Sequence, residues 1–453
     1  MTQSPMLTDA DIRTAVDRVL PSVRADLEKM VRVPSVAFAG FDHSEVERSA
    51  EMVAELCREA GVPDVQILRV EGGQPAVVGR IPAPPGAPTV LLYAHHDVQP
   101  TGDAALWNTP PFEPVERDGR LYGRGAADDK AGVAAHLAAI RAYDGQPPVG
   151  VTLFIEGEEE CGSQTLEAFL REYADILAAD VLVLADSGNW DVGTPALTTS
   201  LRGLANCHVE VRTLDHAVHS GMYGGVVPDA LTGLCRLLAT LHDEAGNVAV
   251  TGLHDAGPTD VEMPEERLRA EAGVLDGVQL IGSGSITARS WNKAAISVIG
   301  IDCPTIRNAS NTLVPSAQAK VSMRLAPGQD PEAAMTSLTA HLEANAPWGS
   351  TVTVSNVELG APYKIDATGP RYQAARDAFQ TAWDGTAPVD MGIGGSIPFV
   401  AEFADAFPDA AILVTGVEDP DARAHGANES LHLGEWRRAC LAEALLLAKL
   451  APR

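Results

Sequence analysis

The sequence is poor in aromatic and basic residues and has no long apolar run. Aromatic residues make up 5% of the 453 residues, so leucine, valine and alanine must fill most of the core. The formal net charge is −28, with 61 acidic against 33 basic residues. This balance excludes a basic nucleic-acid-binding surface and disfavours binding to anionic membranes. Because no apolar run approaches the ~20 residues that span a bilayer, we expect no membrane partner.

Cysteine is also scarce. The six cysteines are scattered and form no close C-x-x-C pair, so neither a disulfide framework nor a thiolate zinc site is expected. The first residues show no basic stretch followed by an apolar one, which a signal peptide would need. We therefore expect a cytoplasmic protein.

Helices and strands alternate in the first part of the chain. The expected helices are residues 8–30, 43–60, 128–144 and 163–178, and the expected strands are 66–69, 76–81, 89–94, 151–156 and 181–185. This alternation predicts an α/β domain with a mixed, largely parallel sheet and helices on both faces.

The pattern changes near residue 197. The order becomes β-α-β-β-α-β, with strand 204–213, helix 228–243, strands 295–301 and 319–326, helix 330–346 and strand 351–359. That order is typical of a ferredoxin-like α+β unit, here with an irregular segment at 244–294. Alternation resumes with helix 370–385, strand 410–414 and helix 432–449. We therefore expect one domain of residues 1–196 and 365–453, interrupted by an inserted domain of residues 197–364.

Histidines and carboxylates follow the predicted apolar strands. They are His95 and Asp97 after strand 89–94, Glu159 and Glu160 after strand 151–156, Asp186 after strand 181–185, and His425 after strand 410–414, while Asp128 precedes a helix. Each alone could be a chance pair, a helix cap, a solvated charge or a turn residue. However, the carboxyl ends of parallel strands share one edge of a sheet, so these groups can converge.

This set of side chains suits metal ions. Histidines and carboxylates without cysteine favour zinc, or manganese or cobalt, over a thiolate site. Two cations need about five such ligands if one carboxylate bridges them. The sequence therefore predicts a site for two divalent metal ions.

Five motifs carry a family resemblance over nearly the full length of the chain. They are YAHHDVQP, LYGRGAADDKAG, EGEEECGS, VLVLADSGNW and ARAHGANES, in that order. With them the chain resembles the aminoacylase/carnosinase-type family of two-metal (dizinc) peptidases. The resemblance implies that His95 and Asp186 hold one metal, that Glu160 and His425 hold the other, and that Asp128 bridges both.

The resemblance also implies catalytic roles. Glu159 would be the general base that takes a proton from a metal-bridging water and later gives it to the leaving amine. Asp97 would orient the metal ligand His95. In the inserted domain, His219 of the stretch DHAVHSGMYGG would stabilise the oxyanion. In the family this histidine reaches the site of the other subunit, which implies a homodimer and makes the inserted domain a lid and dimerisation domain.

Further residues would bind the substrate. Arg324 stands where the family binds the substrate carboxylate, and Asn311 and Thr312 lie beside the same region. In the loop GIGGSIP the family residues are Gly394, Gly395 and Ser396. This loop also departs from the family, because Gly392 and Ile393 replace an Arg-Glu pair common in related dipeptidases. The departure concerns the substrate pocket and leaves the metal ligands intact.

We therefore predict a metal-dependent hydrolase that cleaves the amide bond of dipeptides. The chain length and the long 244–294 segment favour the carnosinase-like dipeptidases within the family. The alternative is an N-acyl-amino-acid deacylase or carboxypeptidase that acts with the same residues. A non-catalytic binding protein of the same fold is disfavoured, because it would not need Glu159 beside a full set of ligands.

Overall fold

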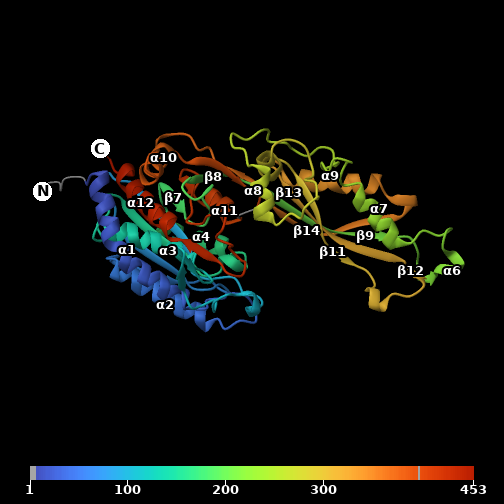
Figure 1. The fold of residues 1–453 in the computed structure, drawn as a ribbon, viewed down its shortest axis with the longest axis horizontal. Coiled ribbons are helices and arrows are strands. Elements are labelled where there is room, and N and C mark those ends of the chain that lie inside the picture. Colours follow the sequence, from blue (N-terminus) through green and yellow to red (C-terminus); the bar gives the residue numbers. More distant parts are fainter. Residues whose placement is uncertain (1–6, 396–397, 453) are drawn as a thin grey trace. The chain divides into compact units, whose positions relative to one another are not determined.

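The structure, a computed structural model, describes residues 7–395 and 398–452. The chain divides into two compact units (Figure 1). The first comprises residues 1–199, 366–391 and 402–453, and the second comprises residues 200–365 and 392–401. The second unit is thus inserted into the first.

Most strands of a nine-stranded sheet belong to the first unit. Its order is β1 (Asp64–Leu68), β2 (Ala76–Ile81), β6 (Gly150–Glu156), β3 (Thr89–His95), β7 (Val181–Leu184), β17 (Ala411–Val414), β8 (Ala196–Leu201) and β15 (Tyr363–Lys364), with β16 (Val389–Ile393) also paired to β8. The four central strands β6, β3, β7 and β17 are parallel, and the strands on either side of them are antiparallel. The carboxyl ends of the four parallel strands therefore share one edge.

The parallel strands are apolar because both of their faces are buried. Every residue of β6, β7 and β17 is buried, and so are all residues of β3 except the first. Strands covered on both faces read as continuous apolar runs rather than as alternating patterns. These strands could therefore be predicted from their apolar runs in the sequence.

Helices cover both faces of this sheet, as the sequence predicted (Figure 1). On one face α3 (Lys130–Ala142) packs against β3 and between α1 (Asp9–Val31) and α12 (Leu433–Leu450), with α2 (Ser44–Glu59) on β1 and β2 and α10 (Pro370–Ala382) on α12. On the other face the rings of Tyr93 and Phe154 meet Phe169 of α4 (Leu166–Glu172) and Phe403 of α11 (Pro398–Ala406). The predicted α/β class is therefore confirmed.

The second unit contains the ferredoxin-like arrangement that the sequence predicted. Its antiparallel sheet has the order β11 (Ala295–Asp302), β13 (Ser316–Leu325), β9 (Gly203–Arg212) and β14 (Thr351–Gly360). The helices α7 (Ala230–Ala239) and α9 (Pro331–Ala344) cover one face. Burial alternates strictly along β13, which is the pattern of a sheet with one covered face.

The structure also contains short elements that the sequence did not predict. They include β8, β15, β16 and α11, which are described above. They also include β4 (Val115–Arg117), β5 (Arg120–Tyr122) and β18 (Ser430–His432) in one small sheet, β10 (Val218–His219) and β12 (Thr312–Leu313) in another, and the helices α6 (Ser220–Tyr223) and α8 (Glu265–Ala272). The predicted helix 163–178 is instead two helices, α4 and α5 (Ala174–Leu177), because the chain leaves helical geometry at Tyr173. None of the described helices is both long and apolar enough to cross a bilayer.

Candidate metal centre

All five predicted metal ligands lie in the first unit. His95 ends β3, Glu160 lies in a short 3-10 turn after β6, and Asp186 follows β7 by two residues. Asp128 precedes α3, and His425 lies in the loop between β17 and β18. Tertiary structure thus brings together residues that are up to 330 positions apart in the sequence.

Asp128 lies between the two histidines. Its Oδ1 is 3.1 Å from His95 Nε2, and its Oδ2 is 3.0 Å from His425 Nε2. His425 Nε2 is also 3.1 Å from Glu160 Oε2. On the other side, His95 Nε2 is 3.9 Å from Glu159 Oε2 and 4.0 Å from Asp186 Oδ1. One carboxylate therefore offers one oxygen to each half of the cluster.

The side chains fit divalent cations. The ligand atoms of His95, Asp128 and Glu160 all lie within 4.8 Å of one another, and so do those of His95, Glu159 and Asp186. Imidazole nitrogens and carboxylate oxygens without thiolates suit zinc and similar first-row cations. These groups are candidate metal sites. Glu159 belongs to the second group, although the resemblance implies a base there rather than a ligand.

The electrostatics of the cluster favour bound cations. Burial raises the pKa of Asp186 to about 7, and the negative charges of Asp128 and Glu160 add to that effect. Burial, with the charge of Asp186, raises the pKa of Glu159 well above its usual range. Hydrogen bonds to Asp128 and Glu160 raise the pKa of His425 to about 11. Carboxylates crowded in this way are stabilised by nearby positive charge, which divalent cations provide.

Asp97 links His95 to the turn that carries the glutamates. His95 Nδ1 is 3.1 Å from the backbone oxygen of Asp97 and 3.4 Å from its Oδ1. The two carboxylate oxygens of Asp97 accept hydrogen bonds from the backbone N–H groups of Glu159 and Glu160, at 3.2 and 3.1 Å. This geometry suits the predicted role of Asp97 in orienting His95.

The structure separates the four glutamates of EGEEECGS. Glu158 accepts hydrogen bonds from Thr165 N at 2.8 Å and from Gln74 N at 2.9 Å, which ties two loops together. Glu156 accepts a hydrogen bond from the Tyr93 hydroxyl at 2.7 Å. Only Glu159 and Glu160 belong to the candidate metal groups.

Sequence reasoning missed a buried ion pair that supports the centre. Arg124 Nη1 lies 2.6 Å from Glu429 Oε2, and both side chains are almost fully buried. Glu429 also accepts hydrogen bonds from the backbone N–H groups of Ala127 and Asp128, at 2.9 and 3.1 Å. Arg124 donates to the backbone oxygen of His425 at 3.0 Å. The pair therefore positions both the Asp128 segment and the His425 loop.

The sequence also gave no signal for contacts made by Gln99 and Asp129. Gln99 donates from its backbone N to Glu160 Oε1 at 2.9 Å and from its side chain to Glu160 Oε2 at 2.7 Å. Asp129 Oδ2 accepts the backbone N–H of His95 at 3.3 Å. Both residues stand inside the motifs YAHHDVQP and LYGRGAADDKAG, but their partners are distant in sequence, so the motifs alone gave no signal for these contacts.

In the second unit three predicted residues lie together. His219 pairs with Thr312 in the small sheet of β10 and β12, and the backbone oxygen of Asn311 accepts from Ser220 N at 2.9 Å. His219 Nδ1 accepts the backbone N–H of Gly221 at 3.0 Å. A neutral ring whose Nδ1 is an acceptor carries its proton on Nε2, so His219 presents an Nε2–H donor.

Arg324 and the glycine loop also belong to the second unit. Arg324 stands on β13 opposite Leu204. The backbone oxygen of Gly394 accepts from Arg202 Nε at 3.0 Å, a contact the sequence did not suggest. A Cβ at Gly394 would lie 2.9 Å from Arg202 Nη2 and 3.1 Å from Ser290 O, so a side chain here would displace the Arg202 guanidinium and crowd Ser290 O. Gly395 follows it, and Ser396 lies outside the described residues.

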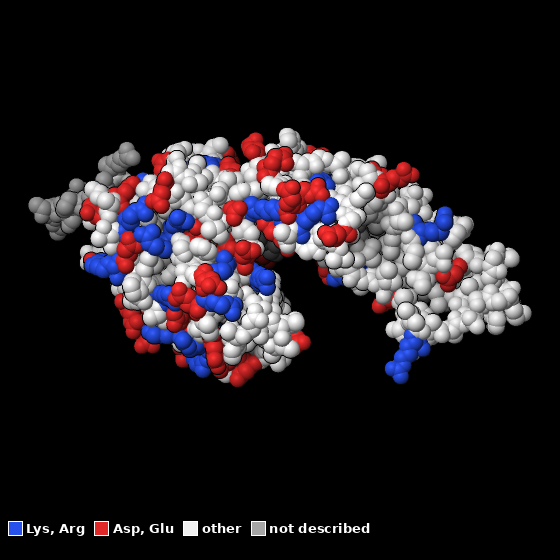
Figure 2. Space-filling model, in the orientation of Figure 1, with Lys and Arg blue, Asp and Glu red and all other residues white. Residues whose placement is uncertain are grey.

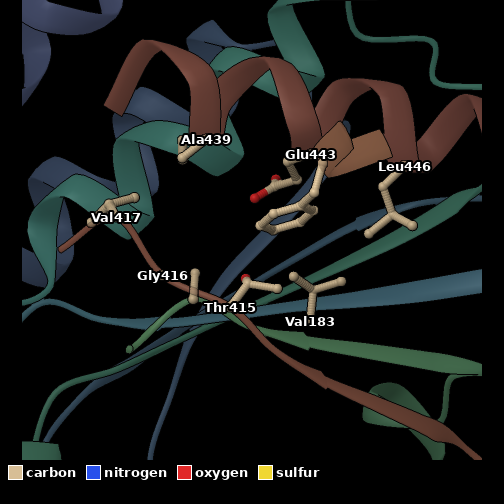
Figure 3. A pocket seen from close by; sticks show the side chains of 10 residues that line it. Val183, Thr415, Gly416, Val417, Ala439, Glu443 and Leu446 are labelled. Atoms are coloured by element: carbon tan, nitrogen blue, oxygen red, sulfur yellow. The ribbon is translucent and has the colours of Figure 1, made fainter. Parts of the chain in front are cut away.

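A cavity beneath α12 is distinct from the metal centre. Figure 3 shows Glu443 reaching from α12 towards Thr415 and Gly416, with Val183 beside them. The cavity holds only about 20 Å³, which is room for a water molecule and not for a dipeptide. His136 Nδ1 lies 2.9 Å from Glu443 and its Nε2 lies 3.0 Å from Tyr93 O, so this histidine has a structural role.

Comparison with known proteins identifies related sequences. Residues 91–449 match the sequence model of peptidase family M20/M25/M40. The chain is 36% identical to the cysteinylglycine-S-conjugate dipeptidase of Corynebacterium striatum over 90% of both chains. It is 31% identical to the beta-Ala-His dipeptidase of Rattus norvegicus, over 82% of this chain and 78% of the relative.

Solved structures show the same fold. Human carnosine dipeptidase 1 superimposes with a TM-score of 0.78 and 25% identity, covering 99% of this chain and 100% of the other. The dipeptidase Dug1p from Saccharomyces cerevisiae also gives a TM-score of 0.78, at 24% identity and 98% coverage of both chains. The similarity therefore extends over both units.

Proposed function

Because this chain belongs to peptidase family M20/M25/M40 and is a metallodipeptidase of that family, we propose that its active centre holds two zinc ions around Asp128. The two carboxylate oxygens of Asp128 lie 3.1 Å from His95 Nε2 and 3.0 Å from His425 Nε2, and this geometry supports the proposal. A carboxylate placed in this way suits a bridge between two cations. Manganese or cobalt could occupy the same nitrogen and oxygen ligands.

The ligands divide into two sets. His95 and Asp186 would hold one cation, Glu160 and His425 would hold the other, and Asp128 would contact both. When bound, the cations would lower the pKa of water and polarise the scissile carbonyl.

Glu159 would act as the general base. It takes a proton from the attacking water while the new C–O bond forms, and it returns that proton to the amine when the C–N bond breaks. Its raised pKa, caused by burial and by Asp186, suits a group that must both accept and donate a proton. Asp97 would keep His95 in orientation through the ring Nδ1.

The second unit would supply the remaining contacts. The Nε2–H of His219 would donate a hydrogen bond to the developing oxyanion, for which one donor contributes roughly 3–4 kcal/mol. Arg324 would pair with the substrate carboxylate in two parallel hydrogen bonds. Asn311, Thr312, Gly394, Gly395 and Ser396 would also contact the substrate.

We propose that two copies of the chain form a homodimer through the second unit, with residues 197–364 as the lid and dimerisation domain. The structural division after Thr199 and after Ile365 supports this domain assignment. Exposed apolar side chains support the dimer. They are Met222, Tyr223 and Val226 in and after α6 and Ile306 in the segment before β12, and Figure 2 shows a mostly uncharged surface around α6. Exposed apolar patches of this kind mark interaction surfaces.

The substrate would be a dipeptide with a free carboxylate. The Corynebacterium relative is named for cysteinylglycine S-conjugates and the rat relative for beta-Ala-His, so both kinds of dipeptide are the first to assay. We propose that the protein acts in the cytoplasm, where dipeptides from protein turnover are available.

Hydrolysis assays test this proposal. Purified protein is stripped with a chelator, reloaded with zinc, manganese or cobalt, and assayed on Cys-Gly, β-Ala-His and matched N-acetyl amino acids. We expect about two bound cations per chain and cation-dependent cleavage of dipeptides. Cleavage of the N-acetyl amino acids alone would reassign the protein as a deacylase. Two bound cations with no cleavage of either class would contradict the proposal.

A further inference from the structure

Glu418 lies at the same edge of the sheet as the metal centre. It follows β17, and its backbone forms a bridge with Gly188, two residues after Asp186. Glu418 N donates to Ser187 O, and Glu418 O accepts from Asn189 N at 2.9 Å. The backbone of Glu418 therefore lies beside the segment that carries Asp186.

This backbone position is fixed by close packing. A Cβ at Gly416 would lie only 1.3 Å from Ser187 O, so only a glycine lets the two segments approach this closely. The neighbouring Asp419 is held by Arg120 Nη2 at 2.8 Å. Glu418 therefore stands on a rigid support, which a residue that recognises a small ligand requires.

The Glu418 carboxylate has no partner among the described residues. No described side chain or backbone N–H donates a hydrogen bond to it, and it belongs to neither candidate metal group. Other acidic groups nearby are satisfied, since Glu429 pairs with Arg124 and Asp129 accepts from His95 N. The side chain of Glu418 is only half-buried, so it remains accessible to a ligand.

The charge around Glu418 is negative. The carboxylates of Asp128, Asp186 and Glu429 act on Glu418 as negative charges, and His425 is the positive group that acts on it. The four carboxylates of Asp128, Glu159, Glu160 and Asp186 would balance two divalent cations, which leaves Glu418 without a counter-charge. A half-buried carboxylate in this setting favours a cationic ligand.

We propose that Glu418 binds the free α-ammonium group of the dipeptide and so selects substrates with an unblocked amino terminus. In an α-dipeptide such as Ala-Gly only the α-carbon separates this ammonium from the scissile carbonyl carbon. A substrate whose carbonyl lies at the Asp128 centre therefore places its ammonium close to the same sheet edge. The inference rests on the proposed dipeptidase function and adds the group that distinguishes dipeptides from acyl-amino acids.

The test compares a dipeptide with an analogue that lacks only the amino group. Ala-Gly and N-propionylglycine form such a pair, and the analogue is measured as a substrate or as a competing inhibitor. In the zinc-loaded variant Glu418→Gln we expect the KM for Ala-Gly to rise roughly tenfold or more, because a charge-assisted hydrogen bond is lost. We expect kcat for Ala-Gly and the KM or Ki of N-propionylglycine to stay within about twofold.

A matched control has the same charge change at a distance. Glu167 on α4 is 85% exposed in its side chain, so Glu167→Gln should leave the KM for Ala-Gly unchanged. Glu418→Asp keeps the charge and should restore part of the preference for Ala-Gly over the analogue.

The outcomes separate the two proposals. If wild-type protein cleaves Ala-Gly, and Glu418→Gln raises the KM or Ki of both compounds equally or of neither, Glu418 does not bind the ammonium group. Loss of bound zinc in Glu418→Gln would also overturn the inference and make Glu418 a residue of the metal centre. If wild-type protein with two bound cations cleaves no dipeptide, the proposed function itself fails.

Discussion

Individual residues in this protein have roles that depend on small differences of position. Glu158, Glu159 and Glu160 are consecutive, yet Glu158 accepts hydrogen bonds from Thr165 and Gln74 while the other two join the metal groups. The 3-10 turn after β6 makes this separation, because successive side chains leave such a turn in different directions. The assignment of the base therefore depends on the turn as much as on the residue type.

The variant Glu159→Gln tests that assignment. We expect it to keep bound zinc but to lose about 10²–10⁴-fold in kcat, because the amide cannot accept the proton of water. Metal analysis and steady-state kinetics on the same preparation check both parts. A kcat close to that of the wild type would remove Glu159 as the base.

Glu156 should make the stability of the fold depend on pH. Burial raises the pKa of Glu156 to about 8, so the folded protein binds a proton there that the unfolded chain releases near pH 4–5. Where the folded state binds more protons, stability falls as pH rises. Glu156 should therefore reduce stability progressively between about pH 5 and 8.

The variant Glu156→Gln mimics the protonated acid and isolates this effect. Its melting temperature relative to the wild type should rise as the pH increases from 5 to 8, measured by thermal unfolding at fixed zinc. A difference between the two proteins that does not change with pH would contradict the prediction.

At the scale of elements, the centre depends on how the segments after β7 and β17 meet. Gly416 allows the β17 segment to pass against the backbone of Ser187, and this contact aligns Asp186 with the loop that carries His425. The loop itself includes positive φ angles at Arg423, His425 and Asn428. Such conformations persist only when surrounding contacts hold them, here through Arg124 and Glu429.

Gly416→Ala tests this junction. Its Cβ would collide with Ser187 O, so the two segments must separate, and we expect a loss of at least about 3 kcal/mol of stability together with weaker zinc binding. Gly188→Ala is the matched control, because its Cβ would meet Glu418 at an ordinary 3.7 Å. Denaturant unfolding and zinc titration measure both variants. Equal behaviour of the two would argue against a tight junction.

At the scale of the whole molecule, the net charge of −28 does not form one acidic face in the view of Figure 2. Acidic and basic side chains are mixed over the first unit there. Many of them form surface ion pairs, for example Arg437 with Asp17 and Arg24 with Glu116. Such exposed pairs contribute roughly 0–1 kcal/mol each, so the stability of the fold comes from its two cores.

The proposed homodimer gives a prediction at this scale. His219→Ala should lower kcat roughly 10²–10³-fold, and Glu159→Gln is inactive for a different reason. If His219 serves the site of the partner subunit, mixing the two variants should restore part of the activity, because a mixed dimer contains one complete site. Activity of mixed and separate samples is measured after subunit exchange has been verified by labelled chains. No recovery would indicate that each chain completes its own site.

The sequence by itself determined the main strands and helices of both units. Apolar runs such as 89–94 and 151–156 mark strands buried on both faces, and the order β-α-β-β-α-β of residues 204–359 marks the ferredoxin-like unit. These signals are local, because periodicity and chain order depend on neighbouring residues. For the same reason the sequence placed His95, Asp186 and the Glu159–Glu160 pair at strand ends, where parallel strands bring side chains to a shared edge.

Only the tertiary structure decided which polar groups pair with which. Arg124 and Glu429 are 305 residues apart, and the sequence around either residue does not predict their contact. The contacts of Glu418 with the Gly188 segment and of Gln99 with Glu160 likewise form only because the fold brings these segments together. The physical reason is that burial of a charge requires a partner supplied by another element, and the chain order does not specify which element lies within reach.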